Sequence, residues 1–213
     1  MLRADVNVIG TISRSAVMRT DKRGNSYLAF GMSVNLKSSD GTQTLMTVFV
    51  NVPDGQQIDM AVYTEGKRIV VNGTMDIHKK DDNLTFFLEA KHIVTDGVGD
   101  GDSISGILHF RGHLRNENVY EERTSKSSGK PFLRFSGYSA EKDGDNFVST
   151  WVSFLRFPEG EAGIDSIKDD CLQPKAHLQI RGTLELDVYK GKININSRVL
   201  EMSKYVKPDY PQA

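Results

Sequence analysis

The sequence lacks the features that mark several large classes of protein. It holds a single cysteine, Cys171, among 213 residues, so one chain can form neither a disulfide framework nor a cysteine metal site. We therefore expect a protein of the reducing cytoplasm. No run approaches 18 consecutive apolar residues, and the N-terminal segment Met1–Asn7 is polar. These patterns predict neither a membrane-spanning helix nor a secretory signal.

An excess of charge of one sign is also missing. The chain has 27 Lys and Arg against 28 Asp and Glu, for a net charge of −1. This balance excludes a histone-like protein that is held to DNA by bulk charge. It is compatible with a local basic groove, in which stacking on aromatic side chains would contribute more of the affinity than usual.

What the sequence does contain is an internal repeat. Segment 24–55 matches segment 129–160 at a constant shift of 105 positions, which pairs Gly24 with Gly129, Tyr27 with Phe132, Phe30 with Phe135 and Phe49 with Phe154. The shift is 102 upstream, at Gly10 and Gly112, and 109 downstream, at Gly73 and Gly182. The second copy therefore has three extra residues in one connection and four in another, and we expect surface loops at both places.

Each copy alternates apolar and polar residues with the period of a strand. One face of the first copy carries Leu28, Phe30, Met32 and Val34. A short helix-like stretch follows the third strand run, at Ile58–Tyr63 and again at Ile164–Leu172. Five strands with a helix after the third are typical of the oligonucleotide/oligosaccharide-binding (OB) barrel. We predict an all-β chain of two tandem five-stranded OB barrels, with a first domain at 1–96, a flexible linker at 97–106, a second domain at 107–206 and a C-terminal tail at 207–213.

Three motifs resemble the bacterial single-stranded DNA-binding proteins. Gly129–Ser136, G-K-P-F-L-R-F-S, is similar to the second strand of that family, and Thr150–Phe157 is similar to its third. Glu65–Gly73, E-G-K-R-I-V-V-N-G, resembles the strand that follows the family's helix. The resemblance covers about residues 7–94 and 108–203. It implies sequence-tolerant, non-catalytic binding of single-stranded DNA in replication, recombination or repair.

The resemblance also bears on assembly. Because family members assemble four barrels, it implies a homodimer of this chain. Many members end in an acidic tail that docks replication partners, whereas this sequence ends in Lys204–Ala213 with one carboxylate side chain. Recruitment of replication or recombination proteins by that route is therefore in doubt. The alternative interpretation is an OB-fold scaffold for protein interactions in a replication or DNA-transfer assembly, with weak affinity for DNA.

Bases require flat aromatic faces, and the resemblance places Trp151 and Phe157 at stacking positions of the third strand and Tyr189 on the hairpin before the last strand. In the second strand of the second copy, alternation places Phe132, Arg134 and Tyr138 on one face, where polar residues lie between the aromatic ones. Tyr27 is the counterpart of Phe132 in the first copy. Alternation leaves open which face of the third strand points outward. A core of Met46, Val48, Val50 and Val52 would expose Phe49, and the constant shift would then expose Phe154. Of the other aromatic residues, we expect Phe30 and Phe135 to lie in the core, and Phe110 and Phe147 to lie in the core or at a dimer interface.

Phosphates require cations, and basic residues flank the expected strands in both copies. The candidates of the first copy are Arg14, Arg19, Lys22, Arg23, Lys67, Lys79 and Lys80. Those of the second copy are Arg115, Lys126, Lys130, Arg134, Lys190 and Lys192. Formal charge hardly differs between the two copies, but residues 1–96 hold six aromatic residues and residues 107–213 hold twelve. We therefore expect the second barrel to bind DNA more strongly.

Motifs for catalysis or cofactor binding are not apparent. Gly97–Gly101 lacks the strand and helix that flank a phosphate-binding loop, so we interpret it as linker. His109 and His113 are four residues apart, a spacing that would bring two metal ligands together only on a helix. The residues around them have the alternating pattern of a strand. No nucleophile, base and orienting group form a recognisable set. We expect no cofactor, no metal and no enzymatic activity.

Overall fold

The computed structural model describes residues 2–38, 41–53 and 60–207, and their contacts divide them into two compact units. The first unit comprises residues 2–108 together with 184–195, and the second comprises 109–183 together with 196–207. Within these residues, no helix has the length and apolar character required to cross a bilayer.

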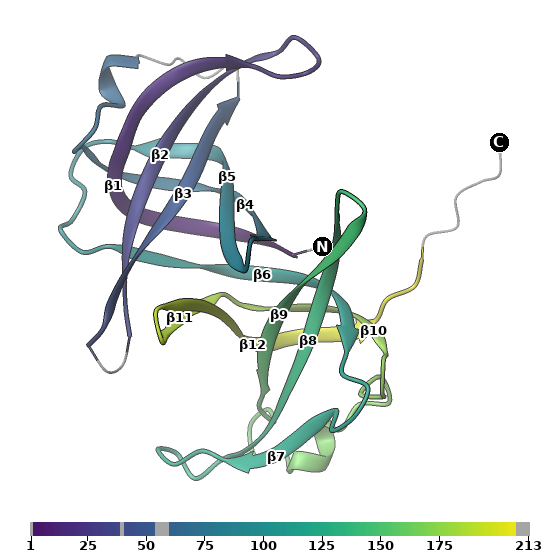
Figure 1. Ribbon diagram of the computed structural model, residues 1–213. Coiled ribbons are helices and arrows are strands. Elements are labelled where there is room, and N and C mark those ends of the chain that lie inside the picture. Colours follow the sequence, from purple (N-terminus) through teal and green to yellow (C-terminus); the bar gives the residue numbers. More distant parts are fainter. Residues whose placement is uncertain (1, 39–40, 54–59, 208–213) are drawn as a thin grey trace. The chain divides into compact units, whose positions relative to one another are not determined.

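Five strands form the first barrel (Figure 1): β1 (Leu2–Thr20), β2 (Ser26–Lys37), β3 (Gln43–Pro53), β4 (Arg68–Lys80) and β5 (Asn83–Val94). The pairing closes into a ring in the order β1-β2-β3-β5-β4-β1. All pairs are antiparallel except β3 with β5, which is parallel. Closure leaves no unpaired edge around the core, and this topology is that of the OB fold.

The second barrel repeats this order. Its strands are β6 (Ser103–Leu114), β7 (Tyr120–Thr124), β8 (Pro131–Asp143), β9 (Asn146–Arg156), β10 (His177–Thr183), β11 (Glu185–Tyr189) and β12 (Lys192–Lys204). The ring runs β6-β8-β9-β12-β10-β6, with β7 paired to the outer edge of β8. The chain is therefore a tandem of two OB barrels, as predicted. The hairpin of β11 and the start of β12 is grouped by its contacts with the first unit.

The predicted period of two accounts for the cores. Leu28, Phe30, Met32 and Val34 are buried on β2, and so are all four apolar residues that we assigned to the core on β3. In the second barrel, Leu133 and Phe135 are buried on β8. The assignments of Phe30 and Phe135 to the core are thus confirmed. Alternate residues face outward because successive side chains of a strand point to opposite sides of the sheet.

The predicted helix-like stretches are shorter than expected. They consist of the 3₁₀ turns η1 (Met60–Val62) and η2 (Ile164–Ile167), each between the third and fourth strand of its barrel. Ile58 lies outside the described residues. The connection with three extra residues is also not purely a loop, because it contains β7. In the first barrel, β1 itself extends to Thr20, which pairs with Ser26, and its pairing with β2 shifts register twice between Ile12 and Val17.

The glycines that end the fourth-strand motif, Gly73 and Gly182, each lie at an irregularity in the pairing with the last strand. A Cβ atom on Gly73 would lie 2.1 Å from the carbonyl oxygen of Glu89, and one on Gly182 would lie 2.3 Å from Ser197 Oγ. Only glycine permits so close an approach of two strands. The repeat therefore retains glycine at this position for a packing reason.

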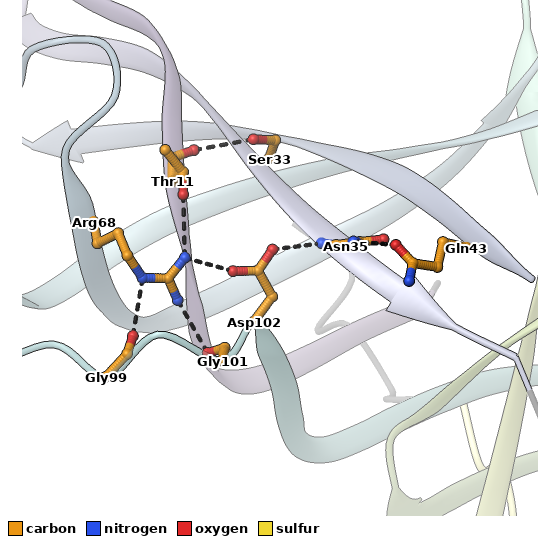
Figure 2. Close-up of polar contacts among 8 residues, drawn as sticks. All are labelled: Thr11, Ser33, Asn35, Gln43, Arg68, Gly99, Gly101 and Asp102. Atoms are coloured by element: carbon orange, nitrogen blue, oxygen red, sulfur yellow. Dashed lines mark hydrogen bonds and ion pairs between the residues drawn. The ribbon is translucent and has the colours of Figure 1, made fainter. Parts of the chain in front are cut away.

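The segment predicted as a flexible linker is partly ordered in the first unit. Arg68 donates hydrogen bonds to the carbonyl oxygens of Gly99 and Gly101, at 2.9 and 3.0 Å, and forms an ion pair with Asp102 at 2.7 Å (Figure 2). The second carboxylate oxygen of Asp102 accepts from the backbone N–H of Asn35 at 2.8 Å. Moreover, β6 begins at Ser103, so the structure places 103–106 in a strand rather than in a linker.

Candidate nucleic-acid interface

A groove of about 590 Å³ crosses the outer face of β1, β2, β3 and β5 in the first barrel. Its lining brings together four predicted site residues, Arg14, Arg19, Tyr27 and Phe49. Phe87 also lines it, as does Phe30, which is buried in the core. The groove therefore combines guanidinium groups with aromatic rings over small side chains.

The aromatic floor of this groove is a stacked pair. The rings of Phe49 and Phe87 lie with centroids 5.4 Å apart and planes 25° from parallel. The His78 ring meets Phe87 edge-on at 5.8 Å. We did not predict Phe87 as a site residue. Its signal was available, because Phe86 and Leu88 face the core and a residue between them must face outward.

The repeat misled us about Phe154. This side chain is fully buried, stacked on Phe135 at 5.1 Å and edge-on to Phe110 at 5.0 Å, whereas Phe49 is 39% exposed. Phe154 therefore cannot stack on a base in this fold, and its assignment as a candidate was wrong.

The physical reason is a change of register. In the first hairpin Lys37 pairs with Gln43, but Lys142, the counterpart of Lys37, pairs with Phe147. The second hairpin is thus one residue shorter, and a shift of one residue exchanges the two faces of a strand. Phe154 consequently occupies the position of Val50, opposite Phe135, as Val50 lies opposite Phe30.

In the second barrel, Trp151 and Tyr138 form the centre of an aromatic cluster. They are directly opposite each other on β9 and β8, with ring centroids 5.1 Å apart. Trp151 is 48% exposed, and the guanidinium of Arg115 lies 5.4 Å from its ring centroid. The structure thus shows which face of the third strand points outward in the second barrel. Val152 and Phe154 face the core, and Trp151 faces outward.

A second pair lies along the same outward face. The rings of Phe132 and Phe157 stack at 5.1 Å, and the guanidinium of Arg198 lies 4.9 Å from the Phe157 centroid. An adjoining groove of about 710 Å³ is lined by Phe157, Lys130 and Arg198 among others. Arg198 was not predicted, because the sequence alone does not show that the last strand lies beside β9.

Ring contacts also continue from Tyr138 in the other direction. His113 lies 5.8 Å from Tyr138 and 4.2 Å from His177, and His177 lies 4.5 Å from Tyr205. The pKa of His177 is lowered, mainly by burial and further by the charges of His113 and Arg111. The rings of His113, His177 and Tyr205 lie against one another, so we do not assign these three residues to the base-stacking set.

Other predicted residues lie apart from these clusters. Lys79 forms an ion pair with Asp82 at 2.9 Å at the β4–β5 turn. Tyr189, 64% exposed, carries the Lys190 ammonium 5.4 Å from its ring centroid, and their hairpin belongs to the first unit rather than to the Trp151 cluster. The remaining basic candidates outside the linings of the two grooves are Lys22, Arg23, Lys67, Lys80, Lys126, Arg134 and Lys192. Of these, Arg134 is exposed on β8 between Phe132 and Tyr138 and shares their outward face.

Phe147 does not lie in the core. It is 74% exposed near the turn of the β8–β9 hairpin, opposite Lys142, and its alternative place at a dimer interface stays a prediction. In contrast, Phe110 is buried as expected.

Comparison with models of known families and a search of curated proteins both found no match. Among solved structures, the chain is similar to the wild-type single-stranded DNA-binding protein of Thermus aquaticus, with 15% identity, a TM-score of 0.48 and coverage of 99% of this chain and 96% of that one. It is also similar to the small single-stranded DNA-binding protein of Streptomyces coelicolor (17%, TM-score 0.34, 46% of this chain and 92% of that one). A mitochondrial single-stranded DNA-binding protein of S. cerevisiae is similar over 47% of this chain and 96% of its own, at 17% identity and a TM-score of 0.35.

Proposed function

We propose that this protein binds single-stranded DNA without catalysis, by stacking bases on exposed aromatic side chains and pairing phosphates with neighbouring arginines. The observation that carries the proposal is the outward face of β8 and β9. There Trp151 and Tyr138 form one aromatic pair, Phe132 and Phe157 form another, and guanidinium groups lie within 5.4 Å of Trp151 and Phe157. Trp151 is exposed and the other three rings are half-buried. Accessible rings beside cations are the combination that sequence-tolerant single-strand binding requires.

The first barrel supports the same proposal with a smaller set. Phe49 and Phe87 supply one stacked aromatic pair in its groove, and Arg14 and Arg19 supply charge. We infer that both barrels contact the strand and that the second contributes more of the affinity. The sequence resemblance to bacterial single-stranded DNA-binding proteins further supports a role in replication, recombination or repair in the cytoplasm.

The test uses the single tryptophan of the chain as its own reporter. Titration with oligo-dT should quench Trp151 emission, because a base stacked on indole quenches it. Trp151→Ala should weaken binding of labelled oligo-dT by about 1–3 kcal/mol, the usual cost of one stacking platform. Unchanged emission at saturation, or wild-type affinity of the variant, would remove Trp151 from the interface.

A matched pair of arginine variants tests the electrostatic part. Arg115→Ala, which removes the guanidinium beside Trp151, should reduce the salt dependence of binding by about 0.7 per lost phosphate contact. Arg181→Ala removes the same charge from β10, where Arg181 is paired with Glu201 at 2.9 Å. If both variants change the salt dependence equally, binding depends on net charge rather than on this face.

We also infer a homodimer, which would bring together four barrels. The support is the sequence resemblance to a family that assembles four barrels. Light scattering at micromolar concentration should give twice the mass of the 23.7 kDa chain, and the mass of a single chain would overturn the inference.

A further inference from the structure

One carboxylate lies within the cationic face of the second barrel. Glu121 is on β7, directly opposite Arg134 on β8, and Arg123 on β7 is directly opposite Phe132. Because residues directly opposite each other share a face of the sheet, Glu121 lies on the same outward face as Arg134 and Phe132. A negative charge at this place opposes phosphate binding. Affinity for the DNA backbone therefore does not account for the presence of Glu121 on this face.

Arg123 binds only one of the two carboxylate oxygens of Glu121. Arg123 donates from Nε and Nη2 to the same oxygen, Oε2, at 2.9 and 2.6 Å. The side chain of Glu121 is 55% exposed. Its pKa is lowered, first by the hydrogen bonds and charge of Arg123 and then by the charges of Arg134 and Arg115. Near neutral pH the group is therefore an ionised acceptor whose Oε2 is held in place by Arg123.

A base would have a stacking surface beside this acceptor. Phe132 stacks on Phe157 and lies diagonally across the β7–β8 pair from Glu121. Diagonal neighbours in a sheet are about 7–8 Å apart, a distance comparable to the width of a base. A base stacked near Phe132 would thus direct its edge toward Glu121 and Arg134.

We propose that Glu121 and Arg134 together read the edge of one base and favour cytosine over thymine. The exocyclic amino group of cytosine would donate to Glu121 Oε1, as carboxylates accept from this amino group in DNA recognition. The ring nitrogen beside the amino group is an acceptor that Arg134 would satisfy. Thymine presents a carbonyl oxygen where cytosine presents the amino group, so two hydrogen-bond acceptors would face each other with no donor between them.

The inference rests on the proposed function, and the experiment separates the two. Oligo-dC and oligo-dT of equal length are titrated above neutral pH, so that every base position is sampled and cytosine stays unprotonated. The quantity measured is the ratio of the two affinities in the full-length protein. Glu121→Gln should reduce the dC:dT ratio about three- to tenfold, because the uncharged amide can also donate to thymine and no longer discriminates by charge.

The matched control is Glu122→Gln. Glu122 is the next residue of β7 and forms an ion pair with Lys168 at 2.7 Å, so this substitution removes the same charge from the neighbouring position. It should leave the dC:dT ratio unchanged. An unchanged ratio in Glu121→Gln would overturn the inference, and so would an equal change in both variants. If Glu121→Gln binds both oligonucleotides more tightly by the same factor, the inference is also overturned, because Glu121 would then only repel phosphates. Failure of the wild type to bind either oligonucleotide would instead refute the proposed function.

Discussion

Replacing Phe154 by alanine should destabilise the second barrel, because this residue is the centre of its aromatic core. Phe154 is fully buried and contacts the rings of Phe110 and Phe135, one edge-on and one stacked. Truncation of a buried phenylalanine costs about 3–5 kcal/mol. Loss of two aromatic pairs, each worth about 0.5–1.5 kcal/mol beyond burial, places the expected cost toward the upper end of that range.

Phe147 provides the matched control on the same strand. It is 74% exposed, and Phe147→Ala should change the free energy of unfolding by no more than about 0.5 kcal/mol. Trp151 is the only tryptophan and lies in the same barrel. Its fluorescence during urea denaturation therefore follows the unfolding of this barrel. With an m-value of about 1–2 kcal/mol/M, Phe154→Ala should lower the midpoint by about 2 M or more.

Two results would refute the reasoning. A loss below about 1 kcal/mol for Phe154→Ala would place Phe154 outside the core, and equal losses for the two variants would show that β9 does not have the register described above. If Phe154→Ala leaves no folded barrel to measure, Phe154→Leu should still lower the midpoint measurably, while Phe147→Leu should not.

Three further predictions concern other parts of the chain. Asp102→Ala should speed proteolytic cleavage near Gly99, because it removes the ion pair with Arg68 and the acceptor for the backbone N–H of Asn35. Cleavage at the wild-type rate would show that the ion pair does not order this segment. Cys171 is buried, and the pKa of its thiol is raised to about 11, mainly by burial and then by Asp169. The thiol should therefore react with alkylating reagents at pH 8 only after unfolding. Rapid labelling of the native protein would contradict the burial. Phe49→Ala should weaken oligo-dT binding by less than Trp151→Ala does while leaving stability almost unchanged, and a larger loss would make the first barrel the stronger binder.

Much of the fold could be predicted from the sequence because its signals are local. The period of two identified the buried residues of β2, β3 and β8, and the repeat showed that the chain contains the same barrel twice. The positions of length changes between the copies located the connections. Helix content was overestimated, since the stretches at η1 and η2 form only single 3₁₀ turns between strands whose pairing dominates the fold.

The candidate site was only partly predictable. Tyr27, Phe49, Trp151 and Tyr138 were identified from alternation and resemblance, and all four have ring atoms on outward faces of their strands. Phe87 was missed although its outward direction followed from its neighbours. Arg198 could not have been found, because the approach of the last strand to Phe157 depends on how strands distant in the sequence pair in the barrel.

The sequence by itself determined which residues could occupy the core, because alternation depends only on the geometry of a single strand. It could not decide which face of β9 points inward, because a hairpin shorter by one residue moves every side chain of the strand to the other side. Nor could it show that Glu121 lies opposite Arg134, since that pairing arises when β7 joins the edge of β8. The tertiary structure decided both, because register and strand order are properties of pairs of strands and not of either strand alone.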